Sequence, residues 1–307
     1  MKRLLWLLVL PGLLAGGFVS ARAQGAGDPD AVRAEKLAEG LWMLTGPGGN
    51  IAVCAGADGV LMVDAQEAPV VPRIRALVDS LTGGRPVRFV LNTHYHGDHV
   101  GGDSAMAAAG AEIVAHEAVR RRMAVEQHNT TFGVTIPAAP PRALPALTFT
   151  DSIAFHVGGR EARVFHVPPA HTDGDAVVWF PDDDVVHMGD LFFNGTYPVI
   201  DVSAGGSIGG MIRAIDLVLP CIGPGTRIIP GHGPVGDRAA LLRFRDMLVL
   251  VRGRVTALVR AGRTLEQARA AKPLADLDAA WGAGFMKPDF FLRVVYDDLA
   301  RERGAAR

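Results

Sequence analysis

The chain has 307 residues, of which 49% are hydrophobic and 21% charged, with 37 Gly and 20 Pro. This composition indicates a compact globular α/β protein and excludes a disordered chain, a collagen-like repeat and a coiled coil. The formal net charge of −1 gives no general attraction for nucleic acid or anionic lipid, so the expected partner is a small-molecule substrate and no nucleic acid.

The N-terminus has the pattern of a secretory signal peptide. A basic start at Lys2 and Arg3 precedes an apolar run, residues 4–14, and Ala21-Arg22-Ala23 is an A-x-A cleavage site. An uncut membrane anchor is the alternative, but the apolar run is short for a bilayer span and a Pro-Gly pair interrupts it. We therefore expect a signal peptide at 1–23 and a mature chain that is periplasmic or secreted, without stable membrane association.

The first half of the mature chain begins with a small, polar segment, residues 24–34, that is expected to be a loose leader. Short apolar runs between turn residues then predict strands, and apolar residues at helical spacing predict helices. The expected strands are 41–45, 51–55, 60–64, 87–92 and 112–115, and the expected helices are 70–81, 104–110 and 117–127. Four prolines and little periodicity predict a long loop at 128–146, which is either functional or disordered.

The second half shows the same alternation of strands and helices. The expected strands are 153–157, 162–166, 177–180, 185–188 and 227–230, and the expected helices are 209–219, 237–260, 264–271 and 288–303. Two successive halves of this kind predict an α/β fold with two sheets enclosed by helices.

The densest chemical signal follows the strand at 87–92, where the sequence reads Thr-His-Tyr-His-Gly-Asp-His and places His94, His96, Asp98 and His99 within six residues. Burying so many unpaired polar groups would be costly, whereas imidazole and carboxylate are preferred zinc ligands. The alternation of side chains lets neighbours reach different metals. This cluster predicts a metal site.

Three further polar residues follow later apolar strands. They are His171 in His-Thr-Asp-Gly-Asp, Asp190 in Gly-Asp, and His232 in Gly-His-Gly. Each alone is typical of a structural residue. Together with the first cluster and in this order, they predict one composite site at the ends of the strands.

These motifs resemble those of the metallo-β-lactamase superfamily, whose pattern is T-H-x-H-x-D-H, a lone His, Gly-Asp and G-H-G, and the resemblance covers roughly residues 38–245. It implies an αββα sandwich of two β-sheets flanked by helices, with two Zn²⁺ at one edge. The implied domains are a catalytic domain at 24–245 and a C-terminal helical extension at 246–307 packed on it. The implied ligands are His94, His96 and His171 for one zinc, Asp98, His99 and His232 for the other, and Asp190 between the two. Asp64 matches the acid that braces the His-rich loop from behind.

The chemistry expected of such a site is hydrolysis. Two zinc ions that share a bridging hydroxide supply a nucleophile at neutral pH and stabilise the developing anion. Asp98 is the expected catalytic residue, because it can orient or relay the proton to the leaving group. Tyr197 is a second candidate, as an oxyanion donor or as a core residue, and His128 is expected either to reach substrate or to be exposed.

The substrate is predicted less sharply than the reaction, because this fold supports several hydrolytic activities. Export favours a small cyclic amide or ester, β-lactam-like or lactone-like, with a β-lactamase proper as the leading specific alternative. The lysine that recognises the β-lactam carboxylate in lactamases with a cysteine ligand is absent, since no Lys occurs between 37 and 271; Arg213, or Ser203 and Ser207, would have to replace it. A different alternative is a non-catalytic metal-binding accessory protein of a periplasmic pathway.

Overall fold

A computed structural model describes residues 28 and 30–305, so the expected signal peptide lies outside the described residues. Two main sheets form the centre of the molecule, with strand orders β1-β2-β3-β4-β5-β6-β9 and β10-β11-β12-β13-β14, and β7 and β8 form a separate hairpin. The strands are β1 Arg33–Ala38, β2 Leu41–Thr45, β3 Ile51–Gly56, β4 Gly59–Val63, β5 Val87–Asn92, β6 Glu112–His116, β7 Gln127–Asn129, β8 Val134–Ile136, β9 Leu147–Phe149, β10 Ser152–Val157, β11 Arg160–His166, β12 Ala176–Phe180, β13 Val185–His187 and β14 Arg227–Ile229.

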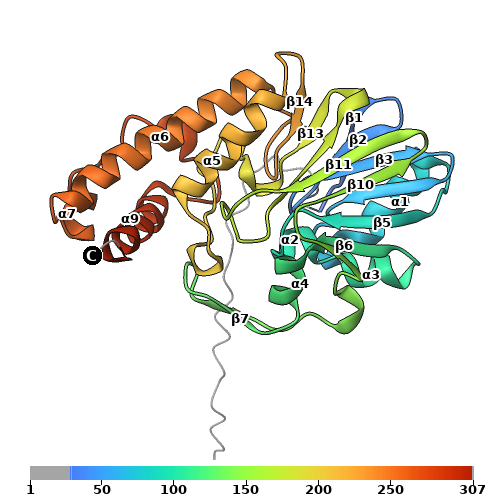
Figure 1. Cartoon of the computed structure of the whole chain (residues 1–307), viewed down its shortest axis with the longest axis horizontal. Coiled ribbons are helices and arrows are strands. Elements are labelled where there is room, and N and C mark those ends of the chain that lie inside the picture. The colour runs from blue at the N-terminus through green and yellow to red at the C-terminus, as the bar shows by residue number, and fades with distance from the viewer. Residues whose placement is uncertain (1–27, 29, 306–307) are drawn as a thin grey trace, which may run out of the picture.

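Helices cover the outer faces of both sheets (Figure 1). The α-helices are α1 Val71–Thr82, α2 Gly97–Val100, α3 Asp103–Ala108, α4 Glu117–Met123, α5 Ile208–Val218, α6 Arg238–Arg260, α7 Leu265–Ala270, α8 Asp278–Trp281 and α9 Pro288–Ala305. Short 3₁₀ helices are η1 Ala68–Val70, η2 Pro141–Ala143, η3 Pro181–Asp183, η4 Gly189–Leu191, η5 Val202–Ala204 and η6 Leu219–Cys221.

The alternation of side chains along the strands produces four layers. In β4, Leu61 and Val63 enter the core between the two sheets, while Val60 and Met62 enter the core beneath α1 and α3. The second sheet repeats this division, since Val178 faces the first sheet and Val177 belongs to the core shared with α5, α6 and α9. The arrangement is an αββα sandwich, which confirms the predicted fold class.

Among the differences from the sequence-based expectation, two segments are the most informative. The leader predicted at 24–34 overlaps β1, which pairs antiparallel with β2 and completes the edge of the first sheet. The loop predicted at 128–146 contains the β7–β8 hairpin and η2 instead. Both errors have the same origin: strands β1 and β8 are largely exposed, so they lack the apolar alternation that reveals a half-buried strand.

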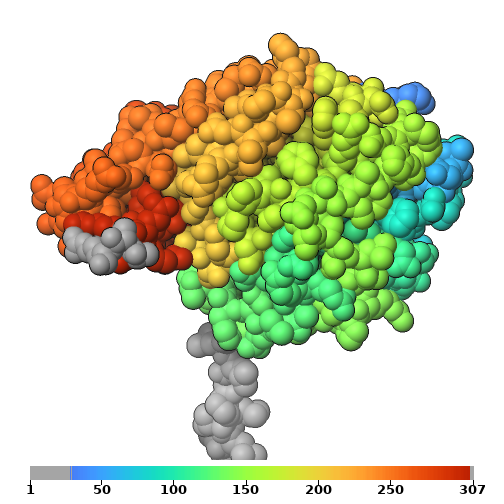
Figure 2. Space-filling model, in the orientation of Figure 1, coloured from blue at the N-terminus to red at the C-terminus, as the bar shows by residue number. Residues whose placement is uncertain are grey.

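The C-terminal helices lie at one side of the second sheet (orange to red in Figures 1 and 2). Helix α6 runs through residue 245 without a break, and residues of α6 and α9 share the core of α5 and the second sheet. In the part of the chain that the structure describes, none of the helices is sufficiently long and apolar for a membrane span. Both cysteines are free; Cys54 is buried and Cys221 is exposed.

Candidate metal centre

The seven predicted ligands lie in loops at one edge of the sandwich. The segment 94–99 follows β5 and enters the one-turn helix α2, and His171 lies between β11 and β12. Asp190 follows β13 in η4, and His232 follows β14. Since β13 and β14 are parallel neighbours, their following loops emerge side by side, and the close approach of Gly231 to Asp190 leaves no room for a Cβ at residue 231.

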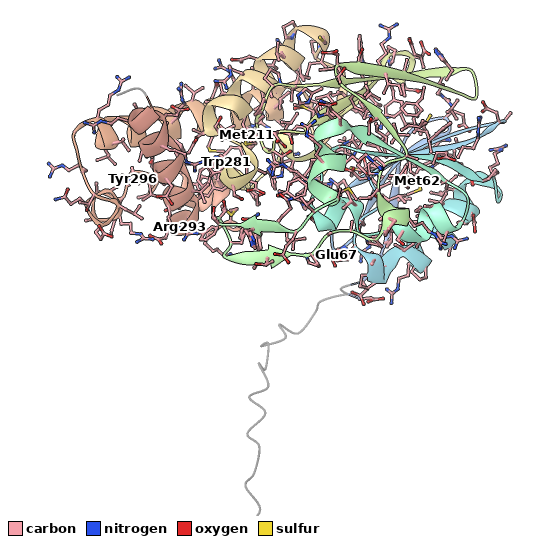
Figure 3. All side chains as sticks on the ribbon, turned by 60° about the horizontal axis from the view of Figure 1, so that its bottom comes forward. Met62, Glu67, Met211, Trp281, Arg293 and Tyr296 are labelled. Atoms are coloured by element: carbon pink, nitrogen blue, oxygen red, sulfur yellow. The ribbon has the colours of Figure 1, made fainter. Side chains whose placement is uncertain are left out.

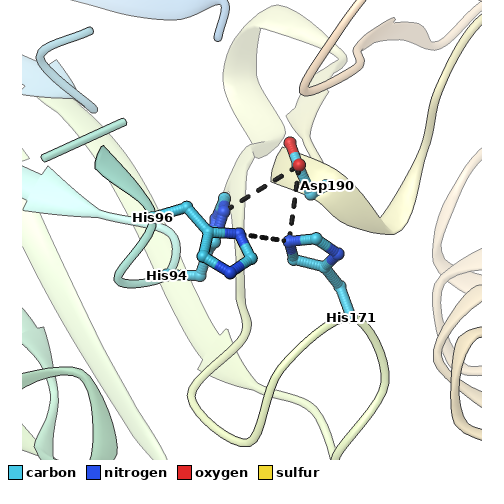
Figure 4. Close-up of side chains that lie close together, drawn as sticks. All are labelled: His94, His96, His171 and Asp190. Atoms are coloured by element: carbon cyan, nitrogen blue, oxygen red, sulfur yellow. Dashed lines mark hydrogen bonds and ion pairs between the residues drawn. The ribbon is translucent and has the colours of Figure 1, made fainter. Parts of the chain in front are cut away.

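The first group comprises His94, His96, His171 and Asp190, which each offer one ligand atom within 4.8 Å of the others (Figure 4). His171 Nε2 lies 2.9 Å from His96 Nδ1 and 3.4 Å from Asp190 Oδ2. His94 Nε2 is 3.9 Å from the same carboxylate oxygen. All four residues are buried or nearly so.

The second group comprises Asp98, His99 and His232, again within 4.8 Å of one another. His99 Nε2 is 3.1 Å from Asp190 Oδ1, and His232 Nε2 is 3.5 Å from that same oxygen. Asp190 therefore lies between the groups, with Oδ2 toward the first and Oδ1 toward the second. This is the position that the sequence analysis assigns to a bridging carboxylate.

Two histidines are fixed through their outer nitrogens by Asp64 and Thr93. Asp64 Oδ2 accepts from His99 Nδ1 at 2.8 Å and from Thr93 Oγ1 at 2.8 Å. Because the Thr93 hydroxyl gives its proton to Asp64, it can only accept from His94 Nδ1, 3.0 Å away. In their neutral forms both rings therefore carry the proton on Nδ1 and turn the Nε2 lone pair toward the cluster.

The other two histidines of the first group are fixed in the same way. His96 Nε2 donates to Asp201 Oδ2 at 2.9 Å, and His171 Nδ1 donates to the carbonyl oxygen of Val199 at 2.9 Å. The inner atoms, His96 Nδ1 and His171 Nε2, are therefore both acceptors. Two lone pairs that face each other at 2.9 Å cannot form a hydrogen bond, whereas a shared cation satisfies both.

This donor set fits divalent metal. Among the described residues, three buried inner atoms have no hydrogen-bond partner: His94 Nε2, His99 Nε2 and Asp190 Oδ1. Such atoms are rare in folded proteins because each forfeits its hydration. Imidazole nitrogen and carboxylate oxygen are zinc ligands, and a hydrogen bond to the outer nitrogen of a ligating His is the usual support of such a site. The seven residues could thus hold two ions.

The pKa shifts of two buried histidines of the first group agree with this arrangement, whereas at His99 burial is outweighed by the neighbouring Asp190, Asp98 and Asp64, which raise the pKa. Burial lowers the pKa of His94 well below its ordinary value and that of His171 to about 4, which keeps both rings neutral and able to bind metal. Burial also lowers the pKa of His232, but the neighbouring Asp190 and Asp98 more than offset it and raise the value to about 9. A proton on His232 Nε2 occupies the place that a cation would take, so metal binding at the second group releases protons.

Asp201 is a functional residue that the sequence analysis missed. Its fully buried carboxylate accepts from His96 and, through the same Oδ2, from Tyr95 Oη at 2.6 Å and Asn129 Nδ2 at 3.0 Å. Oδ1 accepts from the Ser203 hydroxyl and from two backbone amides of η5. An acid 105 residues after His96, in no motif, gives a sequence reader no signal of this contact.

Other candidates have structural roles. The Tyr197 hydroxyl donates to Asp278 Oδ1 at 2.9 Å, and its ring stacks on Phe291, so it supports the packing of the C-terminal helices. A further buried histidine, His187 in β13, is also structural, because its Nδ1 accepts from the backbone amide of Gly189 and fixes the turn before Asp190. His128 is exposed on the hairpin. Asp64 has a positive φ of 66°, a strained conformation that its contacts with Thr93 and His99 hold in place.

A cavity of about 880 Å³ opens above the ligand groups. His96, Asp98, Asp190 and His232 lie at its floor, and its outer wall consists of residues from the β7–β8 hairpin and from the segment 284–286 before α9. The volume is that of a site for a drug-sized molecule.

Comparisons with known proteins connect this site to a family. The model of the metallo-β-lactamase superfamily matches residues 44–272. Hydroxyacylglutathione hydrolase of Methylococcus capsulatus is 34% identical over 105 residues, which cover 34% of this chain and 33% of that protein. Metallo-β-lactamase type 2 of Bacillus cereus is 26% identical over 159 residues, covering 52% and 57%. The chain thus spans between a third and just over half of the length of these curated relatives.

Solved structures agree on the fold. A metallo-β-lactamase from Pontibacter korlensis superposes with a TM-score of 0.60 at 20% identity, covering 71% of this chain and 99% of that one. The DIM-1 metallo-β-lactamase gives a TM-score of 0.57 at 18% identity, covering 71% and 97%. With the αββα sandwich, the motif order and the family match over residues 44–272 together, the chain belongs to the metallo-β-lactamase superfamily.

Proposed function

We propose that the protein is an exported hydrolase with two zinc ions that cleaves a cyclic amide or ester. The observation that supports this most is the convergence of seven acceptor groups on one small volume, with Asp190 facing both groups, at the floor of an open cavity. A bound metal pair supplies Lewis acidity, which activates water at neutral pH and polarises a carbonyl.

Asp98 is the residue we assign to proton transfer. Its side chain is 34% exposed, more than that of Asp190 at 4%, so it reaches both the metal groups and the cavity. Burial raises the pKa of Asp98, but the nearby His99 and His232 outweigh this and hold it below its ordinary value, which keeps the carboxylate ionised. The attacking water forms the new C–O bond and gives its proton to Asp98, which passes it to the leaving nitrogen or oxygen as the scissile bond breaks.

A β-lactamase is the leading specific alternative, favoured by the similarity to the enzyme of Bacillus cereus. The relative named hydroxyacylglutathione hydrolase adds a thioester to the substrates that need testing. The test is hydrolysis of a lactone, a chromogenic cephalosporin and a thioester by protein with and without added zinc. Turnover that a chelator abolishes and zinc restores is expected; binding of zinc without turnover of any of the three would favour the accessory-protein alternative.

Stoichiometry and export are tested separately. Metal analysis after mild dialysis is expected to give about two zinc per mature chain, because seven ligands are too many for one tetrahedral ion. One tight metal and no second at saturating zinc would contradict the dinuclear site. Mass spectrometry of the exported protein is expected to find an N-terminus near Gln24, whereas an intact Met1 would favour an anchored form.

A further inference from the structure

The lining of the cavity above the metal groups carries few charged side chains besides the expected ligands. In the described part of the chain, none of the residues that line it is Lys or Arg. Apart from the expected metal ligands, the charged side chain in the lining is Glu67 (labelled in Figure 3). A substrate carboxylate that lies away from the metal groups would therefore find no Lys or Arg partner in the lining, and burying an unpaired charge is costly.

The residues that could replace the missing lysine are engaged elsewhere. The Ser203 hydroxyl donates to Asp201 Oδ1 at 2.5 Å, and Ser207 caps the N-terminus of α5 by accepting from the amide of Gly210. Neither these serines nor Arg213 lines the cavity. The expectation that one of the three binds a substrate carboxylate is therefore not supported by their positions.

The arginines near the cavity are also committed. Arg293 (labelled in Figure 3) donates to the carbonyl oxygen of Thr131 at 2.5 Å, in the turn of the hairpin, and lies over the Phe290 ring at 4.4 Å. Arg122 makes a two-pronged pair with Asp173 at 2.6 and 2.8 Å. Both guanidinium groups contact protein groups outside the lining.

The outer wall is apolar and partly exposed. The apolar residues that the wall and floor contribute include Phe132, Val134, Ile136, Phe193, Phe285 and Met286. Phe285 is 78% exposed and Val134 is 49% exposed, although Phe132 and Phe285 are in ring contact with centroids 5.8 Å apart. Exposed apolar side chains that gather around a cavity mark a binding surface.

We infer that the substrate is an uncharged ester or lactone that carries an apolar arm, and that the arm lies between the β7–β8 hairpin and the segment 284–286. This inference rests on the proposed function and makes its substrate class specific. The volume of about 880 Å³ accommodates such an arm, whereas a small ring alone would leave most of the cavity filled with water. The Thr196 hydroxyl in the lining is available to a neutral carbonyl or ether oxygen.

A matched substrate series tests the charge preference. γ-Butyrolactones with alkyl arms of two, four, six and eight carbons are compared with partners whose arm ends in a carboxylate, using zinc-loaded protein. We expect kcat/KM at least about tenfold higher for each neutral lactone with a long arm, and a KM that falls about two- to fourfold per added methylene. An equal or higher kcat/KM for the carboxylates, or a KM independent of arm length, would overturn the inference.

Two wall variants with matched controls locate the arm. Phe285→Ala is expected to raise KM about fivefold for the eight-carbon arm and to leave the two-carbon arm unchanged, while Leu217→Ala, also exposed but on α5 outside the lining, changes neither. Val134→Arg is expected to raise kcat/KM for the carboxylates about two- to fivefold. Val249→Arg on α6 is its control. If neither Phe285→Ala nor Val134→Arg changed these kinetic constants, the assignment of the arm to this wall would be wrong.

A binding experiment separates this inference from the proposed function. N-Octyl-2-pyrrolidinone is a lactam that resists hydrolysis, and its affinity for the zinc-loaded protein is compared by calorimetry with that of the analogue ending in a carboxylate. Tighter binding of the neutral lactam, weakened by Phe285→Ala, supports the inference even if no lactone is hydrolysed, in which case only the proposed function fails. Tighter binding of the carboxylate overturns the inference even if the lactones are turned over.

Discussion

The metal site, which we call the floor, and the outer wall of the cavity, residues 127–136 with 284–286, are held in place by different means. The floor comprises the seven expected ligands, four of which line the cavity. On the floor, His94 and His171 are almost fully buried and their outer nitrogens are tied to protein acceptors. In the wall, Phe285 is 78% exposed, and its ring contacts that of Phe132 with the centroids 5.8 Å apart. Ligands anchored before substrate arrives suit chemistry, and the exposed apolar side chains of the wall suit selection among apolar substrates.

Replacing Asp190 is the strongest test of the floor. Asp190→Asn keeps the size but removes the charge that balances two dications, so we expect turnover to fall at least about 100-fold, with loss of bound zinc. The control is Asp103→Asn, a buried acid that accepts from Asn92 away from the cluster. Near-normal turnover of Asp190→Asn in excess zinc would show that Asp190 is not a bridging ligand.

The anchors behind the floor are expected to matter next. Asp201→Asn removes the charged acceptor of His96 Nε2, so we expect about 10- to 100-fold weaker binding of one zinc equivalent. Excess zinc should restore most of the turnover, which separates a positioning role from a loss of fold. Competition with a chromophoric chelator measures the affinity. Unchanged affinity for both equivalents would mean that His96 needs no carboxylate to hold its ring.

Asp64→Asn provides the comparison within the floor. Asp64 supports His99 directly and His94 through Thr93, so this variant is expected to weaken both zinc equivalents where Asp201→Asn weakens one. If both variants weakened the same single zinc equivalent to the same extent, the two ligand groups would not be supported separately.

The sequence predicts the floor much better than the wall, for a physical reason. His94, His96, Asp98 and His99 form a dense motif whose chemistry excludes burial without a cation, and strand ends bring the rest to the same edge. The wall depends on long-range contacts without motifs, such as Asn129 with Asp201 and Arg293 with Thr131. Exposed hairpin strands carry no apolar alternation, so the segment is predicted as a loop although it contains two paired strands.

We also expect the stability of the outer wall to depend on pH, because a titratable residue that is not a metal ligand supports it. The segment 284–286 leads into α9, where the buried Asp298 accepts from the backbone amide of Ile208 at 2.9 Å and so joins α9 to α5. Burial raises the pKa of Asp298 to about 6; the hydrogen bond from Ile208 opposes this most, Glu302 adds to the shift, and Arg301 and Arg252 oppose it. The pKa of Asp298 is higher in the folded than in the unfolded protein. Its protonated carboxyl therefore contributes its full stability below the unfolded pKa, and this contribution is lost as the pH rises through about 6.

Asp298→Asn removes this titration and retains an oxygen that can accept from Ile208. We therefore expect the variant to melt about 2–4 °C higher than the native protein at pH 8, where the native carboxylate is ionised, and to show a smaller advantage at pH 5, which lies between the unfolded and folded pKa values. Melting curves of both proteins at each pH measure the difference, and zinc content should be the same for both at pH 8. A variant that is less stable at pH 8 would show that the charged carboxylate strengthens the bond to Ile208 by more than its burial costs. An advantage that persists unchanged at pH 5 would instead place the native pKa of Asp298 in its ordinary range. Either result would show that the titration of Asp298 does not weaken the support of the wall. Neither would change the description of the metal ligands.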